Sequence, residues 1–303
     1  MNNLQSRLVV ERGFKHNKFN HMSTEVTFSK DFVLGGDLTV RRMGFGAMRI
    51  TGEGIWGLPK DRGEAIRVLK RAVELGVNFI DTADSYGPYI SEDLIAEALH
   101  PYPPGLVIAT KGGFVRTGPN QWTINSHPDH LKDALEGSLA RLNLDRIDLY
   151  QLHRIDPNVP FEETLEFLQG VQEEGLVRHI GLSEVSVAEI KKAEEYVDVV
   201  SVQNKYSPDF RKWESVLEYC EETGKAFIPW NPLNAGNLTA MKKIEQVAAT
   251  IKATPHQAVL SWLLHHSPNI LLIPGTSSVK HLEENIKAEQ VVLTEEQLEA
   301  LEG

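Results

Sequence analysis

Four side chains that can carry a charge or move a proton stand at, or just after, the ends of short apolar runs. Asp81 ends VNFID and Tyr86 lies five residues further on, while Lys111 ends LVIATK and His153 ends IDLYQLH. A lysine at the end of an apolar run needs a partner carboxylate, and Asp81 belongs to the neighbouring run. The sequence therefore predicts a carboxylate, an ammonium, a phenol and an imidazole around one cavity.

These four groups suit the protonation of an alkoxide as it forms from a carbonyl. A free phenol has a pKa of about 10, and a nearby ammonium favours the phenolate, so we expect Lys111 to lower the pKa of Tyr86. We expect Asp81 to hold Lys111 charged and oriented, and His153 to donate a hydrogen bond to the carbonyl oxygen. Since no amino acid supplies a hydride, the reaction requires a nicotinamide or a flavin.

Eight short runs, rich in β-branched and apolar residues, carry or neighbour these side chains. Apolar runs without polar alternation are typical of a parallel sheet covered on both faces, and eight strand-helix repeats close a barrel. We therefore predict a (β/α)8 barrel, in which the carboxyl ends of the strands converge on one mouth. The runs are GFGAMR, VNFIDTA, LVIATK, IDLYQLH, HIGLS, VVSVQN, AFIPWN and ILLIPG.

Amphipathic stretches separate the runs. In the stretch 61–76, apolar residues recur at i, i+3, i+4, i+7 and i+8, which is the spacing of one helical face. Gly76, Gly175 and Gly224 close three of the predicted helices, where a left-handed C-cap is expected. The other predicted helices are 91–100, 127–143, 160–175, 186–196, 211–224, 240–252, 255–266 and 279–288.

Two further patterns concern the start of the fold. The segments VTFSKDFVL and LTVRRM flank GGD, whose glycines tolerate positive φ, so we expect an N-terminal β-hairpin. A doubly wound sheet is the competing architecture, and it needs a glycine-rich turn that leads straight into a helix. GFGAMR has two glycines of that pattern, but Arg49 stands where the third belongs and no helix follows directly. The dinucleotide fingerprint is thus absent.

Length and composition narrow the class of protein. The 303 residues fit a single barrel domain over 23–303, preceded by a flexible extension or a misassigned start over 1–22. A net charge of −11 argues against a nucleic acid partner. No run reaches the ~20 apolar residues of a membrane helix, and no signal peptide is evident. The single cysteine, Cys220, excludes an intramolecular disulfide and fits a reducing compartment, so we expect a cytoplasmic protein of undetermined oligomeric state.

The motifs DTADSYG, IATKGG, LYQLH, IGLSE, VSVQN and IPGTS, in this order and spacing, resemble the aldo-keto reductase superfamily from about residue 30 to residue 303. The resemblance implies a (β/α)8 barrel that binds NADPH and reduces aldehydes and ketones to alcohols. The catalytic tetrad of that family matches Asp81, Tyr86, Lys111 and His153, and Tyr86 is implied as the general acid. The expected cofactor is NADP(H), with NAD(H) less favoured.

The resemblance also implies cofactor contacts. Ser183 and Gln203 match positions that hydrogen-bond the nicotinamide carboxamide, and Trp230 matches an aromatic ring that stacks on the nicotinamide. The strand-eight loop and the helix after it match the segment that holds the adenosine phosphates and adenine. That segment contributes Gly275, Thr276, Ser277, Ser278, His281, Glu284 and Asn285. The other expected contacts are Gly46, Ala47, Met48, Asp81, Asn231, Pro232 and Leu233.

Two departures from the family pattern bear on the cofactor. Many relatives have asparagine where Glu184 stands, so a donor to the carboxamide is replaced by a carboxylate. Many also have lysine or arginine where Gly275 and His281 stand, which weakens the positive charge available to a 2'-phosphate. Lys280 and the neighbouring serine hydroxyls are the candidates to compensate.

The expected substrate is a small carbonyl compound. We expect Trp56 in the first loop and Phe114 after the third run to contact it, together with Tyr86 and His153. For each loop aromatic, simple packing without a substrate contact is an equal alternative. The histidines of SHPDH, His127 and His130, are candidate metal ligands, but Ser126 and Asp129 are better explained as capping residues of the helix that follows, so we expect no metal site.

Two other functions stay open. A barrel lysine can form a Schiff base with a carbonyl, as in aldolases, although Asp81 would keep Lys111 protonated and therefore a poor nucleophile. Potassium-channel beta subunits share the implied fold and bind NADPH while serving chiefly as partners, so a regulatory subunit with weak reductase activity is the second alternative. Borohydride trapping tests the first alternative, and NADPH oxidation with a panel of aldehydes tests the second.

Overall fold

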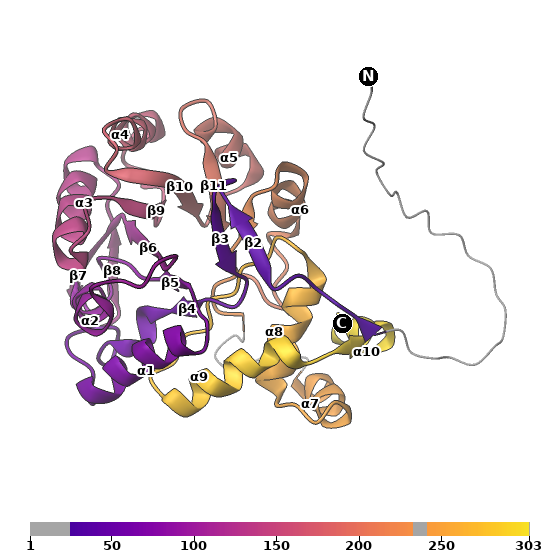
Figure 1. The fold of residues 1–303 in the computed structure, drawn as a ribbon. Coiled ribbons are helices and arrows are strands. Elements are labelled where there is room, and N and C mark those ends of the chain that lie inside the picture. Colours follow the sequence, from indigo (N-terminus) through magenta and orange to yellow (C-terminus); the bar gives the residue numbers. More distant parts are fainter. Residues whose placement is uncertain (1–24, 233–240, 303) are drawn as a thin grey trace, which may run out of the picture.

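Short parallel strands form the centre of the molecule, and helices surround them (Figure 1). The computed structural model describes residues 25–232 and 241–302. The seven hydrogen-bonded strands follow one another around the sheet in the order β12-β11-β10-β9-β6-β5-β4. They are β4 (Phe45–Gly46), β5 (Phe79–Asp81), β6 (Val107–Gly112), β9 (Ile147–Leu152), β10 (Val177–Ser183), β11 (Val199–Gln203) and β12 (Ala226–Phe227).

The eighth predicted run, ILLIPG at 270–275, closes the ring between β12 and β4. Ile270 forms a parallel bridge with Phe227 of β12, and Leu272 forms one with Met43, just before β4. The Leu272 amide donates to the Arg42 carbonyl, and its own carbonyl accepts from Gly44 N. The chain is therefore a (β/α)8 barrel, as the sequence predicts.

Each predicted amphipathic stretch forms a helix. Gly76, Gly175 and Gly224 have φ of 88°, 79° and 73°, so all three adopt the expected left-handed conformation after helices. The helices are α1 (Arg62–Glu74), α2 (Ile90–Leu99), α3 (Pro128–Leu142), α4 (Phe161–Glu173), α5 (Val187–Ala193), α6 (Glu214–Thr223), α7 (Met241–Thr250), α8 (Pro255–His266), α9 (Val279–Ile286) and α10 (Glu295–Leu301), with the 3-10 helices η1 (Ala47–Ile50) and η3 (Lys287–Gln290).

The predicted N-terminal hairpin closes the end of the barrel where the strands begin. β2 (Asp31–Leu34) and β3 (Leu38–Arg41) pair antiparallel. Leu34 and Val40 are buried in the cluster that fills the barrel interior, together with Phe79 and Leu149. Because the hairpin occupies this end, the opposite end, at the carboxyl termini of the strands, is the end available for a site.

Two small sheets were not predicted. β1 (Glu25–Val26) pairs with β13 (Leu293–Thr294), and β7 (Phe114–Gly118) pairs with β8 (Gln121–Ile124) in a hairpin that follows β6. The proposed extension over 1–22 lies outside the described residues, so the predicted domain boundary stays a prediction. Within the described residues, no helix is long and apolar enough to span a membrane.

Candidate active site

The two-residue period of the strands decides which side chains face the barrel axis. On β6, Val107 and Ala109 belong to the interior cluster, so Lys111 continues the same inward row. On β5, Phe79 faces inward and Asp81 follows it two residues later. The inward rows of β5 and β6 are therefore apolar at the start and end in Asp81 and Lys111, which places these polar groups at the mouth.

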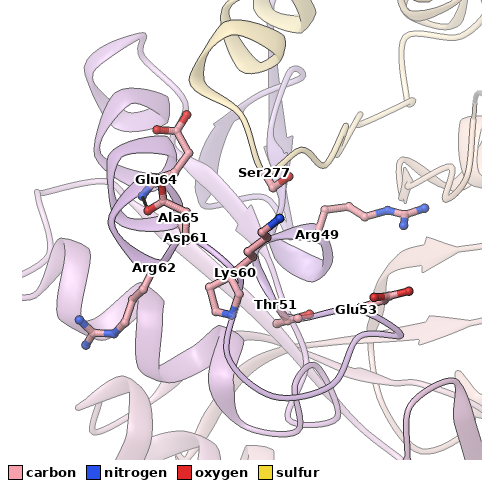
Figure 2. A pocket seen from close by; sticks show the side chains of 11 residues that line it. Arg49, Thr51, Glu53, Lys60, Asp61, Arg62, Glu64, Ala65 and Ser277 are labelled. Atoms are coloured by element: carbon pink, nitrogen blue, oxygen red, sulfur yellow. Dashed lines mark hydrogen bonds between the residues drawn. The ribbon is translucent and has the colours of Figure 1, made fainter.

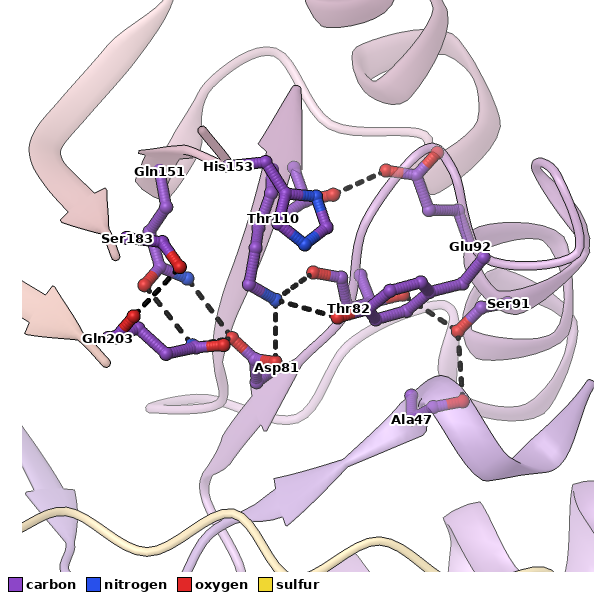
Figure 3. Close-up of polar contacts among 12 residues, drawn as sticks. Ala47, Asp81, Thr82, Ser91, Glu92, Thr110, Gln151, His153, Ser183 and Gln203 are labelled. Carbon is purple, nitrogen blue, oxygen red and sulfur yellow. Dashed lines mark hydrogen bonds and ion pairs between the residues drawn. The ribbon is translucent and has the colours of Figure 1, made fainter. Parts of the chain in front are cut away.

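Lys111 lies at the centre of this polar layer. Its Nζ donates to Asp81 Oδ2 at 2.7 Å and to the Thr82 carbonyl at 2.7 Å, and it lies 3.4 Å from the Tyr86 hydroxyl. Lys111 is fully buried, and 2% of Asp81 is exposed. The other oxygen of Asp81 accepts from the side-chain amides of Gln151 and Gln203, at 3.0 and 2.9 Å (Figure 3). The carboxylate is thus satisfied by three donors.

The charge state of this cluster follows from its partners. Burial alone would lower the pKa of Lys111, but Asp81 and Tyr86 outweigh burial and raise that pKa, so the side chain is an ammonium. Burial also raises the pKa of Tyr86 above its ordinary value, although Lys111 acts in the opposite direction. Lys111 thus lowers the pKa of Tyr86 as expected, but desolvation of the phenolate is the larger effect, so the pKa is raised overall.

His153 stands just beyond β9 and completes the predicted tetrad. Its ring centroid lies 5.8 Å from that of Tyr86 and 4.6 Å from that of Phe114. Burial first, and then the charges of Lys111 and Arg154, hold the pKa of His153 well below its ordinary value, so the imidazole is neutral. Its Nδ1 is buried and has no hydrogen-bond partner among the described residues. A neutral ring in this place can donate one hydrogen bond to an incoming oxygen.

Half-buried aromatic side chains border the tetrad, and a buried arginine holds them. The guanidinium of Arg116 lies 3.6 Å from the ring centre of Trp122 and 5.8 Å from that of Trp56. It donates to the carbonyls of Ser85 and Gly54, at 2.8 and 3.0 Å, and to two carbonyls of its own hairpin. Arg116 therefore ties the first loop and the loop that carries Tyr86 to the β7–β8 hairpin, a role the sequence reading missed.

The residues assigned to the nicotinamide end lie close together and form hydrogen bonds within the protein. Ser183 Oγ donates to the Gln203 carbonyl at 2.7 Å. The Trp230 indole donates to Glu184 Oε1 at 2.7 Å, and the same oxygen accepts from Lys205 N at 2.5 Å. Glu184 has φ of 57°, a left-handed conformation that is costly for glutamate. The carboxylate in place of asparagine thus orients the indole of Trp230.

The remaining predicted contacts at the mouth lie on either side of it. Gly46, Ala47 and Met48 form the end of β4 and the start of η1, with Gly46 and Ala47 buried and Met48 half-buried. Asn231, with φ of 54°, and Pro232 are half-buried and follow Trp230. Leu233 lies outside the described residues.

The residues assigned to the adenosine end lie on the strand-eight loop and α9. Thr276 Oγ1 accepts from Ser278 N at 3.2 Å, and Ser278 is the N-cap of α9. The first amide of α9, Val279 N, donates to Glu64 Oε1 of α1 at 3.0 Å. Ser277 and His281 are exposed, Glu284 is half-buried and lies 3.9 Å from Lys280, and Asn285 is buried. One donor of the helix N-terminus is therefore already bound to a carboxylate.

A cavity of about 640 Å³ lies between this loop and the first loop, and Ser277 lines it together with Arg49 and Lys60 (Figure 2). The side chain of Lys60 extends toward Ser277. Arg49 runs past Gly275, where an added Cβ would come within 3.5 Å of Arg49 Cγ. Neither Arg49 nor Lys60 forms an ion pair with a described residue, whereas Arg62, also in the lining, pairs with Glu97. The sequence reading missed both cations, because no motif marks them.

Arg154, directly after His153, is the other residue that the motifs did not single out. It is half-buried at the mouth, and its Nη1 donates to the His153 carbonyl at 2.5 Å and to Ser183 Oγ at 2.9 Å. Its guanidinium carbon lies 5.5 Å from the ring centre of Phe114 and 5.8 Å from that of Trp230. Its position directly after His153 at a strand end is the one sequence feature that could have marked Arg154 as a residue of the mouth.

The fold and the site define a (β/α)8 barrel with ionisable side chains gathered at the carboxyl ends of its strands. The chain belongs to the aldo/keto reductase family, whose family model matches residues 42–303. It is accordingly an oxidoreductase that acts on carbonyl compounds. Among the described residues, no group of three or more His, Cys, Asp or Glu side chains could hold a metal ion.

Three known proteins illustrate the likeness. An uncharacterized oxidoreductase of Schizosaccharomyces pombe is 54% identical over 262 residues, which cover 86% of this chain and 85% of that protein. Pyridoxine 4-dehydrogenase of Escherichia coli is 42% identical over 281 residues, 91% of this chain and 98% of that enzyme. A crystal structure of an aldo-keto reductase from Klebsiella pneumoniae in complex with NADPH has a TM-score of 0.75 at 25% identity, covering 90% and 93% of the two chains.

Proposed function

We propose that the protein is an NADP(H)-dependent reductase that converts an aldehyde or ketone to an alcohol, with Tyr86 as the general acid. The observation that carries the proposal is the buried contact of Lys111 with both Asp81 and Tyr86, beside a neutral His153. The family membership and the NADPH complex of the related Klebsiella pneumoniae enzyme support the choice of cofactor. When bound, the nicotinamide supplies the hydride that the protein's own side chains lack.

The chain's own residues account for the proton. His153, which is neutral, donates a hydrogen bond to the carbonyl oxygen and orients it. Tyr86 then donates its hydroxyl proton to that oxygen as negative charge develops there. Lys111 stabilises the phenolate left behind, and Asp81 keeps the ammonium charged and aimed. Phe114 and Trp56 contact the substrate and restrict water at the mouth.

The polar layer does not favour a Schiff-base mechanism. Lys111 is fully buried, carries a raised pKa and already donates to two oxygens. An amine held as an ammonium cannot attack a carbonyl. We therefore expect no covalent adduct after borohydride treatment in the presence of an aldehyde.

The residues near the proposed cofactor cleft fit a dinucleotide. Trp230, held by Glu184, offers a flat ring for the nicotinamide, and Ser183 and Gln203 stand beside it. At the other end, the cavity next to Ser277 contains two cations without described ion pairs, which suits a phosphate group. We assign Arg49 and Lys60 to a phosphate of the cofactor, in place of the basic residues that many relatives carry on the strand-eight loop.

Removing both cations, in the variant Arg49→Met with Lys60→Met, is expected to weaken NADPH binding by about tenfold or more, since one charge-assisted hydrogen bond contributes about 1.5–3 kcal/mol and the variant removes two cations. Fluorescence titration with NADPH and with NADH measures the effect. A loss confined to NADPH assigns the cations to the 2'-phosphate, and an equal loss assigns them to the diphosphate. Lys70→Met, an exposed lysine of α1 outside the cavity lining, is the control. Unchanged affinity for both nucleotides would contradict the assignment.

The pH dependence of reduction follows from two pKa shifts. His153 has a pKa well below 6.5 and Tyr86 has one above 10.0, so the neutral imidazole and the protonated phenol coexist throughout the range between these values. We expect kcat/KM for aldehyde reduction to stay flat from about pH 6.5 to pH 9 and to fall only as Tyr86 loses its proton at higher pH. A titration step near pH 6.5 that disappears in His153→Gln would show that the imidazole ionises in the working range, against this expectation.

One assay tests the proposed function as a whole. NADPH oxidation is followed at fixed enzyme concentration with a panel of aldehydes. Pyridoxal comes first, because it is the aldehyde related by oxidation to the substrate named in the 42% identical relative. Reduction of at least one aldehyde, with formation of the alcohol, is the expected result. Tight NADPH binding without any turnover would instead favour the partner-subunit alternative.

A further inference from the structure

Arg154 has donors to spare at the mouth of the barrel. A guanidinium carries five N–H groups, and the two hydrogen bonds that Arg154 forms with described residues both use Nη1, which donates to the His153 carbonyl and to Ser183 Oγ. Its Nε and Nη2 donate to no acceptor among the described residues. No described carboxylate lies within ion-pair distance, although burial lowers the pKa of Arg154 and so makes a partner valuable.

Among the described residues, Arg154 is a cation at the mouth without an ion-pair partner. Lys111 is neutralised by Asp81, and His153 is neutral. Glu184 raises the pKa of Arg154 through its charge but forms no ion pair with it, and its Oε1 accepts from the Trp230 indole and from Lys205 N. Arg116 donates its hydrogen bonds to four backbone carbonyls. An anionic group entering the mouth therefore meets Arg154 as its available partner.

The walls around the guanidinium are flat and aromatic. The ring centres of Phe114 and Trp230 lie 5.5 and 5.8 Å from Cζ. The ring of Phe114 also lies 4.6 Å from that of His153, which ties the arginine to the position expected for the reacting carbonyl. Because the ring of Trp230 is assigned to the nicotinamide, a planar substrate ring is expected on the Phe114 side of the guanidinium, with an oxygen on that ring bound to Arg154.

We propose that Arg154 sets substrate specificity, and that the preferred substrates are aromatic aldehydes bearing an ionised oxygen, a phenolate or a carboxylate, next to the aldehyde group. This inference rests on the proposed reductase function and specifies its substrate class. The anionic oxygen accepts from Nε and Nη2, the free edge of the guanidinium. His153 and Tyr86 then receive the neighbouring carbonyl oxygen. An aldehyde without the anion keeps the aromatic contacts and loses this pair of hydrogen bonds.

Matched pairs of aldehydes test the proposal. Pyridoxal carries a phenolate next to its aldehyde and pyridine-4-carbaldehyde lacks it, while 2-carboxybenzaldehyde and benzaldehyde form the corresponding carboxylate pair. In wild type, kcat/KM is expected to favour the anionic member of at least one pair. In Arg154→Met the ratio of the two kcat/KM values should fall about tenfold or more, as expected for the loss of a charge-assisted hydrogen bond. Arg154→Lys, which keeps the charge without the fork, should recover part of that ratio.

Controls separate this role from others. Lys205→Met removes a different half-buried cation, whose ammonium lies over the Phe210 ring, and should leave the ratio unchanged. The NADPH dissociation constant is measured by fluorescence in every variant. If Arg154→Met slows both members of each pair by the same factor, or leaves both ratios at the wild-type value, the specificity role is overturned while the reductase function stands. If wild type reduces no aldehyde although it binds NADPH, the proposed function itself fails and this inference fails with it.

Discussion

Replacing Tyr86 with phenylalanine is expected to lower kcat for carbonyl reduction by about 10²- to 10⁴-fold, the usual contribution of a positioned general acid. The phenol is 6% exposed, and its hydroxyl lies 3.4 Å from Lys111 Nζ. Phenylalanine keeps the ring contacts with His153 and Trp122 and removes only the proton donor. NADPH binding should stay close to wild type. The measurement is single-turnover reduction at saturating aldehyde, combined with a fluorescence titration.

A matched variant excludes a simple packing effect. Tyr102→Phe also removes a tyrosine hydroxyl, one that donates to the Leu142 carbonyl between α2 and α3, away from the mouth. That variant should keep its turnover. Wild-type turnover in Tyr86→Phe would remove Tyr86 from the role of general acid and leave the origin of the transferred proton open to another group, first of all His153.

Asp81→Ala is expected to destabilise the fold by about 3–5 kcal/mol, because it leaves the buried Lys111 without its countercharge. The ammonium is fully buried and donates to Asp81 at 2.7 Å, and the amides of Gln151 and Gln203 lose an acceptor at the same time. Burial lowers the pKa of Lys111 and the charge of Asp81 raises it, so the pKa of Lys111 should fall when Asp81 is removed. Urea unfolding followed by circular dichroism measures the change in the free energy of unfolding.

A surface pair provides the comparison. Asp31 lies 3.8 Å from Arg41 with both side chains substantially exposed, so Asp31→Ala should cost about 0–1 kcal/mol. Adding Lys111→Met to Asp81→Ala removes the stranded charge and should restore part of the lost stability. If the single variant Asp81→Ala is as stable as wild type, the ion pair does not hold the polar layer together in the way described.

The barrel and its polar layer could be predicted because both depend on local patterns. The strands are short apolar runs, and the period of two puts Asp81 and Lys111 on the same inward face as the apolar residues before them. The N-terminal hairpin could be predicted for the same reason, because the glycine-containing turn before β3 is a local pattern. The eighth run was placed correctly, although it closes the ring through isolated bridges at Ile270 and Leu272.

Features that depend on contacts between distant segments were not predictable. The pairing of Arg116 with carbonyls of two other loops, and the approach of Arg49 to Gly275, join residues that no sequence pattern connects. The direction of the Tyr86 pKa shift was missed because it depends on the balance between burial and the Lys111 charge, and burial follows only from the assembled fold. The sequence shows that Glu184 replaces an amide donor. Its hydrogen bond with the Trp230 indole joins residues 46 positions apart and follows only from the folded structure.

Cys220 has a practical consequence. It is the chain's single cysteine, it lies fully buried on α6, and burial raises the pKa of its thiol to about 12. Such a thiol offers almost no thiolate to an alkylating reagent at neutral pH. A cysteine introduced at an exposed site, such as Ser277→Cys beside the strand-eight loop, should therefore take up a maleimide dye alone, and the native protein can serve as its own unlabelled background in optical measurements of nucleotide arrival.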